Sequence, residues 1–132
     1  MQPGTAYLAP DGHHIGLADR RSLLVSTAAP VGGFRPSGTF LFESVAAVCG
    51  ASAIGVILTG MGNDGCAGLG ELRRAGGRII AQDEASSVVF GMPAAAIAAG
   101  LAHTTLPIER IAARLVAWCA PPLVEREKGT DS

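Results

Sequence analysis

The stretch from Ile54 to Gly65 constrains the fold of this chain more than any other. Residues 54–58 form an apolar run with β-branched side chains, long enough for a strand and too short for a helix. Because no polar residue alternates with them, we expect both faces of the strand to be buried, as in a parallel sheet covered by helices. Three glycines and a helical pattern follow, which makes Asn63 or Asp64 the expected N-cap. Asp64 therefore stands at the carboxyl end of a central strand, where catalytic groups collect in open α/β sheets.

The other apolar segments continue an alternation of strands and helices. Expected strands are residues 6–9, 15–18, 23–27, 79–81 and 101–106, and expected helices begin near residues 39, 66, 93 and 107. Polar residues 19–22 separate two of these strands, which predicts an antiparallel hairpin near the N-terminus. The remaining alternation predicts an α/β fold with a mostly parallel, doubly wound sheet flanked by helices.

Apolar residues recur at helical spacing within the expected helices. Ser37 is the expected N-cap of the first helix, and Gly50 is expected just after its end. Leu69 and Leu72 are expected to face inward from the second helix. The other expected inward residues are Leu41, Val45, Val48 and Cys49 in the first helix and Ile108, Ile111, Ala112, Leu115 and Val116 in the last.

Composition excludes several classes of protein. The 132 residues suffice for one domain with a core, and the formal net charge of -1 argues against a nucleic-acid binder. No apolar run approaches the ~20 residues of a membrane helix, and the N-terminus lacks the layout of a signal peptide, so we expect a cytoplasmic protein without membrane insertion. The three cysteines are widely separated and form no C-x-x-C pair, so we expect no metal and no cofactor.

Three loops are expected at the same edge of the sheet if the crossovers are right-handed, namely residues 10–14, 60–64 and 83–87. Together they carry carboxylates, hydroxyls, imidazoles and glycine N–H groups. This inventory suits acyl transfer, in which an acid orients a histidine and backbone donors hold an oxyanion.

Residues 56–65 resemble a signature of the CheB family, the chemotaxis receptor methylesterases. Residues 80–93 are similar to a second signature of the same catalytic domain. Weaker similarity lies in residues 6–10 with His14, in residues 35–37, in residues 106–108 and in the last helix, so that the resemblance spans about residues 4–117. It implies that residues 1–120 form part of a CheB-type catalytic domain, incomplete relative to that of the family, followed by a polar tail at 121–132.

The resemblance implies a serine hydrolase that removes methyl groups from glutamyl methyl esters on the cytoplasmic domain of chemoreceptors. In this family a phosphorylated receiver domain often controls a Ser-His-Asp triad. The family's catalytic aspartate falls on Asp64 and its active-site methionine on Met61. Its serine and histidine precede the block that resembles residues 6–10, so we expect this chain to lack both and to hydrolyse little or no ester alone.

The chain's own serines and histidines are poor substitutes for the missing pair. Ser52 lies in the nearest imitation of the nucleophile motif but precedes its strand, whereas a nucleophile elbow follows one. His13 and His14 are expected near the same edge of the sheet as Asp64, but as surface or supporting imidazoles. His103 is expected to be unrelated to the site.

The other candidate residues each have a second interpretation. Expected to line the site are Gly60, Met61, Gly62, Asn63, Ser86, Ser87, Arg35 and His14. Asp64 could serve only as an N-cap, and Met61 could serve only in packing. Ser86 and Ser87 could instead cap the backbone of their own loop. Arg35 could hold a substrate carboxylate or pair with a surface acid.

Two departures from the family pattern favour a second hypothesis. The family usually has His before Arg-Pro-Ser and Asp two residues after it, where this chain has Phe34 and Thr39. This favours a catalytically silent module that docks on receptors or on a receiver domain. A third hypothesis, a phosphate cradle at residues 60–65, ranks last because that loop holds no Lys or Arg and Asp64 would repel phosphate.

A final expectation concerns the sheet edge. The family's first strand lies inside its sheet, so this chain is expected to leave a strand edge or an apolar patch uncovered. Uncovered edges pair readily with another chain, which predicts a homodimer or poor solubility.

Overall fold

A computed structural model describes residues 1–120 of the chain, so the expected tail at 121–132 lies outside the described residues. The strands are β1 (His14–Leu17), β2 (Leu23–Ser26), β3 (Ile54–Ile57), β4 (Arg78–Gln82) and β5 (Thr104–Leu106). The helices are α1 (Gly38–Val48), α2 (Cys66–Arg74), α3 (Met92–Ala98) and α4 (Ile108–Cys119), with a short 3₁₀ turn at Gly50–Ser52. β1 and β2 form an antiparallel hairpin, and β3, β4 and β5 form a parallel sheet in that order.

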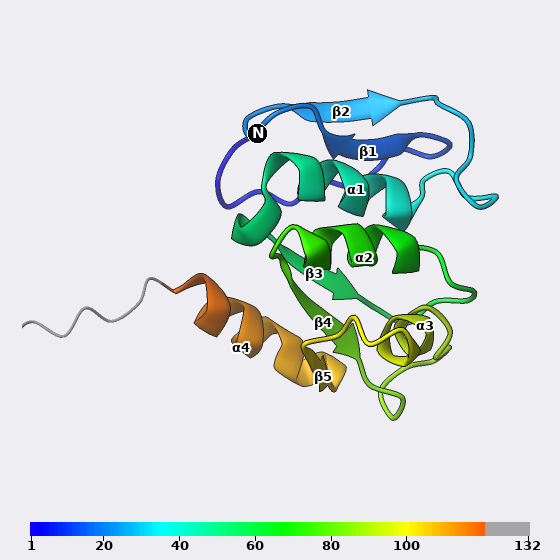
Figure 1. Cartoon of the computed structure of the whole chain (residues 1–132), viewed down its shortest axis with the longest axis vertical. Helices are drawn as coiled ribbons and strands as arrows, with labels where there is room; N and C mark the ends of the chain where they lie inside the picture. Colours follow the sequence, from blue (N-terminus) through cyan, green and yellow to red (C-terminus); the bar gives the residue numbers. More distant parts are fainter. Residues whose placement is uncertain (121–132) are drawn as a thin grey trace, which may run out of the picture.

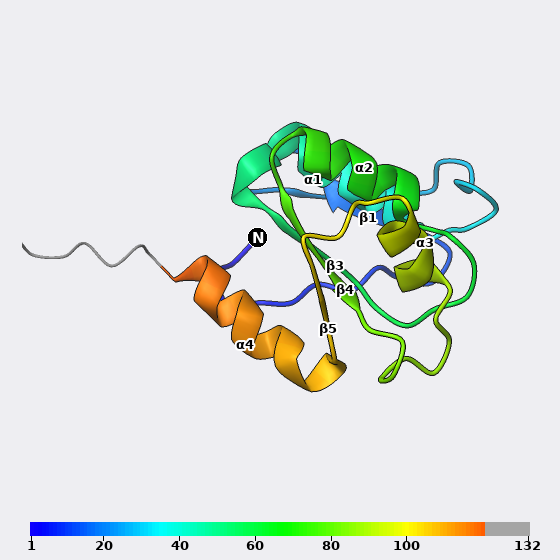
Figure 2. The same ribbon diagram turned by 60° about the horizontal axis from the view of Figure 1, so that its bottom comes forward.

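These elements are arranged in layers, with α1 between the hairpin and α2 (Figure 1). α1 and α2 lie on one side of the parallel sheet and α4 on the other (Figure 2). The core on the α2 side consists of Ile57, Leu69, Leu72, Ile79, Ala81 and Ala96. The predicted α/β class, the parallel sheet with helices on both sides and the separate hairpin are all confirmed.

The predicted ends of α1 and the predicted inward residues of α2 are also confirmed. Ser37 is the N-cap of α1, and its Oγ accepts a hydrogen bond from Phe40 N at 3.4 Å. Gly50 follows the end of α1 with a φ of 50°, a left-handed conformation that glycine adopts readily. Leu69 and Leu72 of α2 have no exposed surface, as their spacing predicted.

The strand predicted at residues 6–9 is wrong. These residues form no strand, and Leu8 is 91% exposed. An extended segment becomes a strand only when a neighbour takes its N–H and C=O groups, and no described residue pairs with this one.

The predicted apolar face of α4 is wrong at several positions. Ile111 is buried and Leu115 is half-buried, but Ala112 and Ile108 are exposed and Val116 is 72% exposed. Three strands give α4 too narrow a surface to cover a stripe two turns long.

Strand β3 is less buried than its apolar sequence predicted. Gly55 and Ile57 are buried on the face of β3 toward α2, whereas Ile54 and Val56, on the other face, are only half-buried. Among the helices of residues 1–120, none is both long and apolar enough to cross a membrane.

Candidate active site

The turn after β3 is held firmly against the start of α3. Gly60 N donates to Val89 O at 3.0 Å, and Gly60 O accepts from Met92 N at 2.9 Å. A Cβ on Gly60 would lie 2.6 Å from Met92 Sδ, so any larger residue would force the Met92 side chain to move. The turn is therefore anchored at Gly60, and residues 61–64 follow it at the carboxyl edge of the sheet.

Asp64 does not cap α2, contrary to the expectation from sequence. The N-cap is Gly65, which has a φ of 90° and makes no side-chain capping bond. The Asp64 carboxylate instead accepts hydrogen bonds from the beginning of α1: from Ser37 Oγ to Oδ1 at 2.8 Å, from Gly38 N to Oδ2 at 2.8 Å and from Thr39 N to Oδ1 at 3.5 Å. The positive end of the α1 dipole adds to these bonds in stabilising the negative charge.

Among residues 1–120, one acceptor position of the Asp64 carboxylate has no donor. A carboxylate has about four acceptor positions, two on each oxygen. Oδ1 of Asp64 uses both of its positions within residues 37–39, and Oδ2 uses one, on Gly38 N. Asp64 is only half-buried, so Oδ2 can accept one more donor while the other bonds hold the group in place.

A surface hollow of about 400 Å³ opens beside Asp64. It is lined by Val31, Gly32, Phe34, Thr39, Asn63, Asp64, Cys66 and Ala67. No residue of the loop 83–87 lines it, so the three predicted loops do not share one crevice. The Asp64 carboxylate thus lies beside a hollow whose lining is mostly apolar.

His14 lies behind Ser37 and has no exposed surface. Its Nδ1 accepts from Ser37 N at 3.2 Å, and its Nε2 is 3.0 Å from Ala29 O. The ring stacks on Phe40, with 4.3 Å between ring centroids and 11° between the ring planes. His14 thus reaches Asp64 only through Ser37.

The model of the CheB methylesterase family matches residues 1–115 of the chain. The chain belongs to the CheB methylesterase family. It is 59% identical over 119 residues to a protein-glutamate methylesterase/protein-glutamine glutaminase of Anaeromyxobacter dehalogenans (89% of this chain, 35% of the relative). It is 51% identical over 118 residues to protein-glutamate methylesterase FrzG of Myxococcus xanthus (89% of this chain, 35% of the relative), so it spans about a third of the length of these relatives.

A solved member of the CheB family has the same fold. The crystal structure of the Thermotoga maritima CheB methylesterase catalytic domain matches with a TM-score of 0.82 and 34% identity, over 85% of this chain and 61% of that chain. The resemblance noted in the sequence is therefore confirmed, and so is the fold that it implied.

The second CheB signature folds back on itself. Ser86 Oγ donates to Asp83 Oδ1 at 2.6 Å and accepts from Ile108 N at 3.0 Å, and Ser87 Oγ donates to Asp83 O at 2.6 Å. The buried Gln82 donates from Nε2 to Ser86 O at 2.8 Å and accepts from Thr59 N at 2.7 Å. The loop thereby braces the turn after β3, and whether its serines also contact a substrate stays a prediction.

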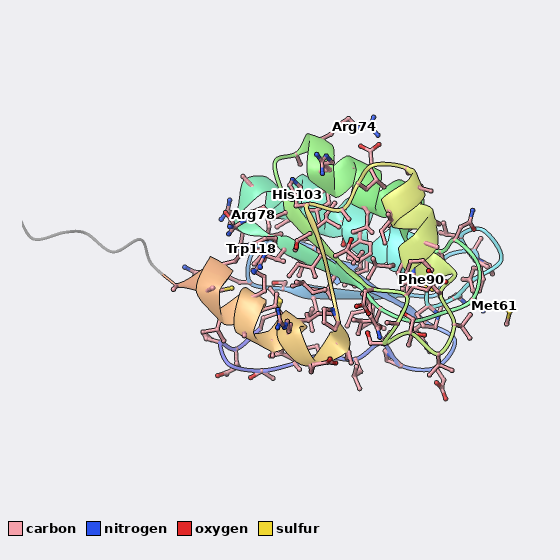
Figure 3. The ribbon with its side chains drawn as sticks, turned by 90° about the horizontal axis from the view of Figure 1, so that it is seen from below. Met61, Arg74, Arg78, Phe90, His103 and Trp118 are labelled. Atoms are coloured by element: carbon pink, nitrogen blue, oxygen red, sulfur yellow. The ribbon has the colours of Figure 1, made fainter. Side chains whose placement is uncertain are left out.

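Of the other candidate residues, only Asn63 lines the hollow. Arg35 is exposed, and its Nη1 donates to Thr27 O at 3.1 Å. Met61 is 78% exposed and points away from the body of the molecule, at the opposite end from Arg78, His103 and Trp118 (Figure 3). Gly62 and Asn63 share the Met61 turn, and Asn63 also lines the hollow.

The alternative serine and histidines lie away from Asp64. Ser52 belongs to the 3₁₀ turn before β3 and hence to the amino edge, as predicted. His13 Nδ1 is 2.8 Å from Asp11 O, in its own turn. His103 Nδ1 accepts from Ile79 N at 2.9 Å; burial, and then the charges of Arg73 and Arg78, lower the pKa of His103 below its ordinary 6.5. Within residues 1–120, no imidazole is bonded to Asp64.

Sequence reasoning missed several residues of the site. Ser37 was predicted as a cap, but nothing in the sequence linked it to an aspartate 27 positions later. The lining by Val31, Gly32, Cys66 and Ala67 was also missed, because only the packing of α1 on α2 brings these residues together. Within the described residues, no three His, Cys, Asp or Glu side chains gather as metal ligands would.

Proposed function

We propose that residues 1–120 are part of a CheB-type catalytic domain and supply the acid of its Ser-His-Asp site through Asp64. The observation that carries this proposal is the carboxylate itself, held by Ser37 Oγ and Gly38 N with one acceptor position of Oδ2 open beside a hollow. An acid that orients a histidine must be fixed in direction and still accept one N–H. Asp64 meets both conditions.

The reaction is hydrolysis of a glutamyl methyl ester. A serine Oγ attacks the γ-carbonyl carbon while an imidazole takes its proton, and the same imidazole then gives the proton to the departing methanol. Water releases the acyl group as glutamate by the same two transfers. Asp64 accepts the other N–H of the imidazole, which selects its tautomer and stabilises the imidazolium that forms in each step.

The serine and the imidazole come from outside the described residues. Ser37 is bonded to Asp64 but is 3% exposed and caps α1, so a substrate cannot reach it. His14 uses both ring nitrogens internally. The chain covers 61% of the solved catalytic domain, which leaves room in that domain for both missing groups.

The substrate class is a methylated glutamate on the cytoplasmic domain of a chemoreceptor, and a phosphorylated receiver domain is the expected regulator. The names of the relatives pair methylesterase with glutaminase activity. Both reactions replace a leaving group on the same γ-carbonyl, methanol in one and ammonia in the other. One oriented acid therefore serves both.

Methanol release from methylated receptor tests the proposal. We expect none from the chain alone and release after addition of a family segment that carries the serine and the histidine. Asp64→Asn, which keeps the shape and removes the charge, should lower this release by about 10³- to 10⁴-fold. Undiminished release by the mixed Asp64→Asn protein would contradict the role of Asp64.

A second candidate function is a catalytically silent module that docks on receptors. Phe34 favours it, because a 43% exposed aromatic ring at the hollow stands where the family usually has histidine. Thr39 replaces the usual aspartate and accepts from Gly65 N at 3.1 Å, a purely structural bond. Receptor binding without methanol release, even after addition of the segment, would favour this function over the first.

The homodimer remains a prediction that the edge position of β3 supports. The row of backbone groups on the free side of β3 is a template for pairing with a second chain. Light scattering checks it, and a monomer at all concentrations tested would rule it out.

A further inference from the structure

We propose that His14 and Ser37 are positioning residues for Asp64: a neutral, fully buried imidazole fixes the main chain of Ser37, and Ser37 in turn fixes the carboxylate. The catalytic part of this inference rests on the proposed function of Asp64. The structural part stands on the hydrogen bonds of the chain itself. It gives a role to a buried titratable group that the ester chemistry does not use.

The partners of His14 define one tautomer. Ser37 N–H can only donate, so Nδ1 must be its unprotonated acceptor, at 3.2 Å. Ala29 O can only accept, so Nε2 carries the proton, at 3.0 Å. No lone pair of the ring remains free, and the ring has no exposed surface. His14 therefore cannot exchange protons with a substrate in this arrangement.

Ser37, whose main chain is held by His14, in turn holds the carboxylate of Asp64. Its single hydroxyl proton goes to Asp64 Oδ1, and its oxygen accepts from Phe40 N. The next residue, Gly38, donates its N–H to Oδ2. Residues 37–39 thus form a cradle for the carboxylate, and the direction of its donors depends on where the main chain of Ser37 is held.

The imidazole is itself held from two sides. Its ring stacks on Phe40 in the first turn of α1, and its Nε2 reaches across to Ala29 in the loop after β2. Since His14 is the first residue of β1, it connects the hairpin to the beginning of α1. The hairpin therefore serves as the outer support of the acid site rather than as an unrelated appendage.

The amide of Gly38 reports this arrangement directly. The first N–H groups of a helix have no acceptor within the helix, so hydrogen-exchange protection of Gly38 comes from Asp64. His14→Phe removes both ring hydrogen bonds and keeps the stacking on Phe40, whereas His14→Asn keeps a short acceptor toward Ser37 N. Asp64→Ala serves as the reference for complete loss of protection.

In the full chain, His14→Phe should release the main chain of Ser37 and so weaken the bond from Gly38 N to the charged Asp64 carboxylate. We expect the protection of the Gly38 amide to fall by roughly tenfold or more, as for the loss of one bond to a charged acceptor. His14→Asn should restore part of it, and the amides of β4 should exchange as in the unmodified chain. Unchanged Gly38 protection in His14→Phe, alongside its loss in Asp64→Ala, would overturn the inference.

Two further measurements keep the inference testable if His14→Phe fails to fold. The ¹⁵N spectrum of the imidazole in the unmodified chain should show the Nε2–H tautomer, and a ring protonated at Nδ1 would overturn the proposal. Ser37→Ala should also lower Gly38 protection and Ser37→Thr should retain it. Equal protection in the two serine variants would contradict the role of the Ser37 hydroxyl.

The catalytic part is tested in the mixed methanol-release assay. His14→Phe should lower kcat and leave KM unchanged, because substrate contacts are not altered. If Asp64→Asn leaves turnover intact, the proposed function fails. If Asp64→Asn abolishes turnover while His14→Phe changes neither kcat nor Gly38 protection, only the present inference fails.

Discussion

Within the part of the chain that the structure describes, two Ser–Asp pairs lie at helix beginnings. Ser37 donates to Asp64 at 2.8 Å and accepts from the first turn of α1. Ser86 donates to Asp83 at 2.6 Å and accepts from Ile108 N, the first residue of α4. The pairs use the same two residue types and the same bond, yet of these four residues Asp64 alone lines the hollow of about 400 Å³.

The difference lies in which elements satisfy the acid. Asp64 takes its donors from α1, more than 20 positions away in the chain, so its carboxylate is carried by one element and oriented by another. Asp83 Oδ1 takes both the N–H and the hydroxyl of Ser86, three positions away, and so closes its own loop. An aspartate whose donors lie in its own loop stabilises that loop. An aspartate whose donors lie in another helix can keep one oxygen accessible to a further hydrogen-bond donor.

The largest effect on stability is expected where the two regions are joined. Gln82 connects Thr59 N to Ser86 O through two part-buried hydrogen bonds, and Gln82→Leu removes both of them. We expect the free energy of unfolding to fall by about 2 to 4 kcal/mol in urea denaturation. Ser87→Ala, which removes only the bond to Asp83 O, is the control and should cost about 1 kcal/mol or less. Equal losses in both variants would mean that Gln82 does not join the regions.

The Asp64 pair depends on close contact between helices, and the Asp83 pair does not. A Cβ on Gly68 would lie 2.7 Å from Thr39 O and 2.8 Å from Phe42 Cβ, so Gly68→Ala must push α1 away from α2. We expect a loss of about 1 to 3 kcal/mol in the free energy of unfolding. In the same helix, a Cβ on Gly70 meets only Arg74 Nη2 at 3.9 Å, so Gly70→Ala should gain about 0.5 to 1 kcal/mol. Shifts of the same sign would count against the close approach.

Removing each serine separates capping from orientation. Ser37→Ala and Ser86→Ala each lose a bond at a helix N-terminus, and both should cost about 1 kcal/mol of stability. In the mixed methanol-release assay, Ser37→Ala should lower kcat by about tenfold, because a hydrogen bond to a charged acceptor is lost, while Ser86→Ala should leave it unchanged. A fall in kcat with Ser86→Ala alone would reverse the comparison.

The smallest effect is expected at the opposite edge of the sheet, away from both pairs. Because burial and the charges of Arg73 and Arg78 lower the pKa of His103 below 6.5, the folded state favours its neutral form. The resulting stabilisation is present above pH 6.5 and is lost as the pH falls from 6.5 through the lowered pKa. His103→Asn, which keeps an acceptor for Ile79 N, should therefore lose less stability between pH 7 and pH 5 in urea titrations. Parallel pH profiles would contradict this assignment.

Features that depend on residues close together in the sequence could be predicted, and features that depend on distant residues could not. The hairpin, β4 and the buried faces of Leu69 and Leu72 follow from apolar spacing and glycine punctuation, and all were predicted. The position of Asp64 at the end of β3 followed from the same logic and from the CheB resemblance. The exposure of Leu8 and Val116 could not be predicted, because it depends on which surfaces lie opposite them.

The candidate site shows the same division. Ser37 could be recognised as a cap because capping is read within four residues. Its bond to Asp64 could not be, since only the contact of α1 with α2 brings the two together. Choosing Asn63 or Asp64 as the cap of α2 failed because the left-handed Gly65 takes that place and frees the carboxylate to turn toward α1.

The occupied positions around Asp64 also decide from where a partner can arrive. Carboxylate oxygens accept best near the plane of the group, and residues 37–39 already supply three of the about four donors that the group can accept. An incoming imidazole can therefore donate its N–H only to the open acceptor position of Oδ2. The element that carries this imidazole must therefore approach Asp64 from that direction. The open acceptor position of Oδ2 thus restricts how the two parts of the site can assemble.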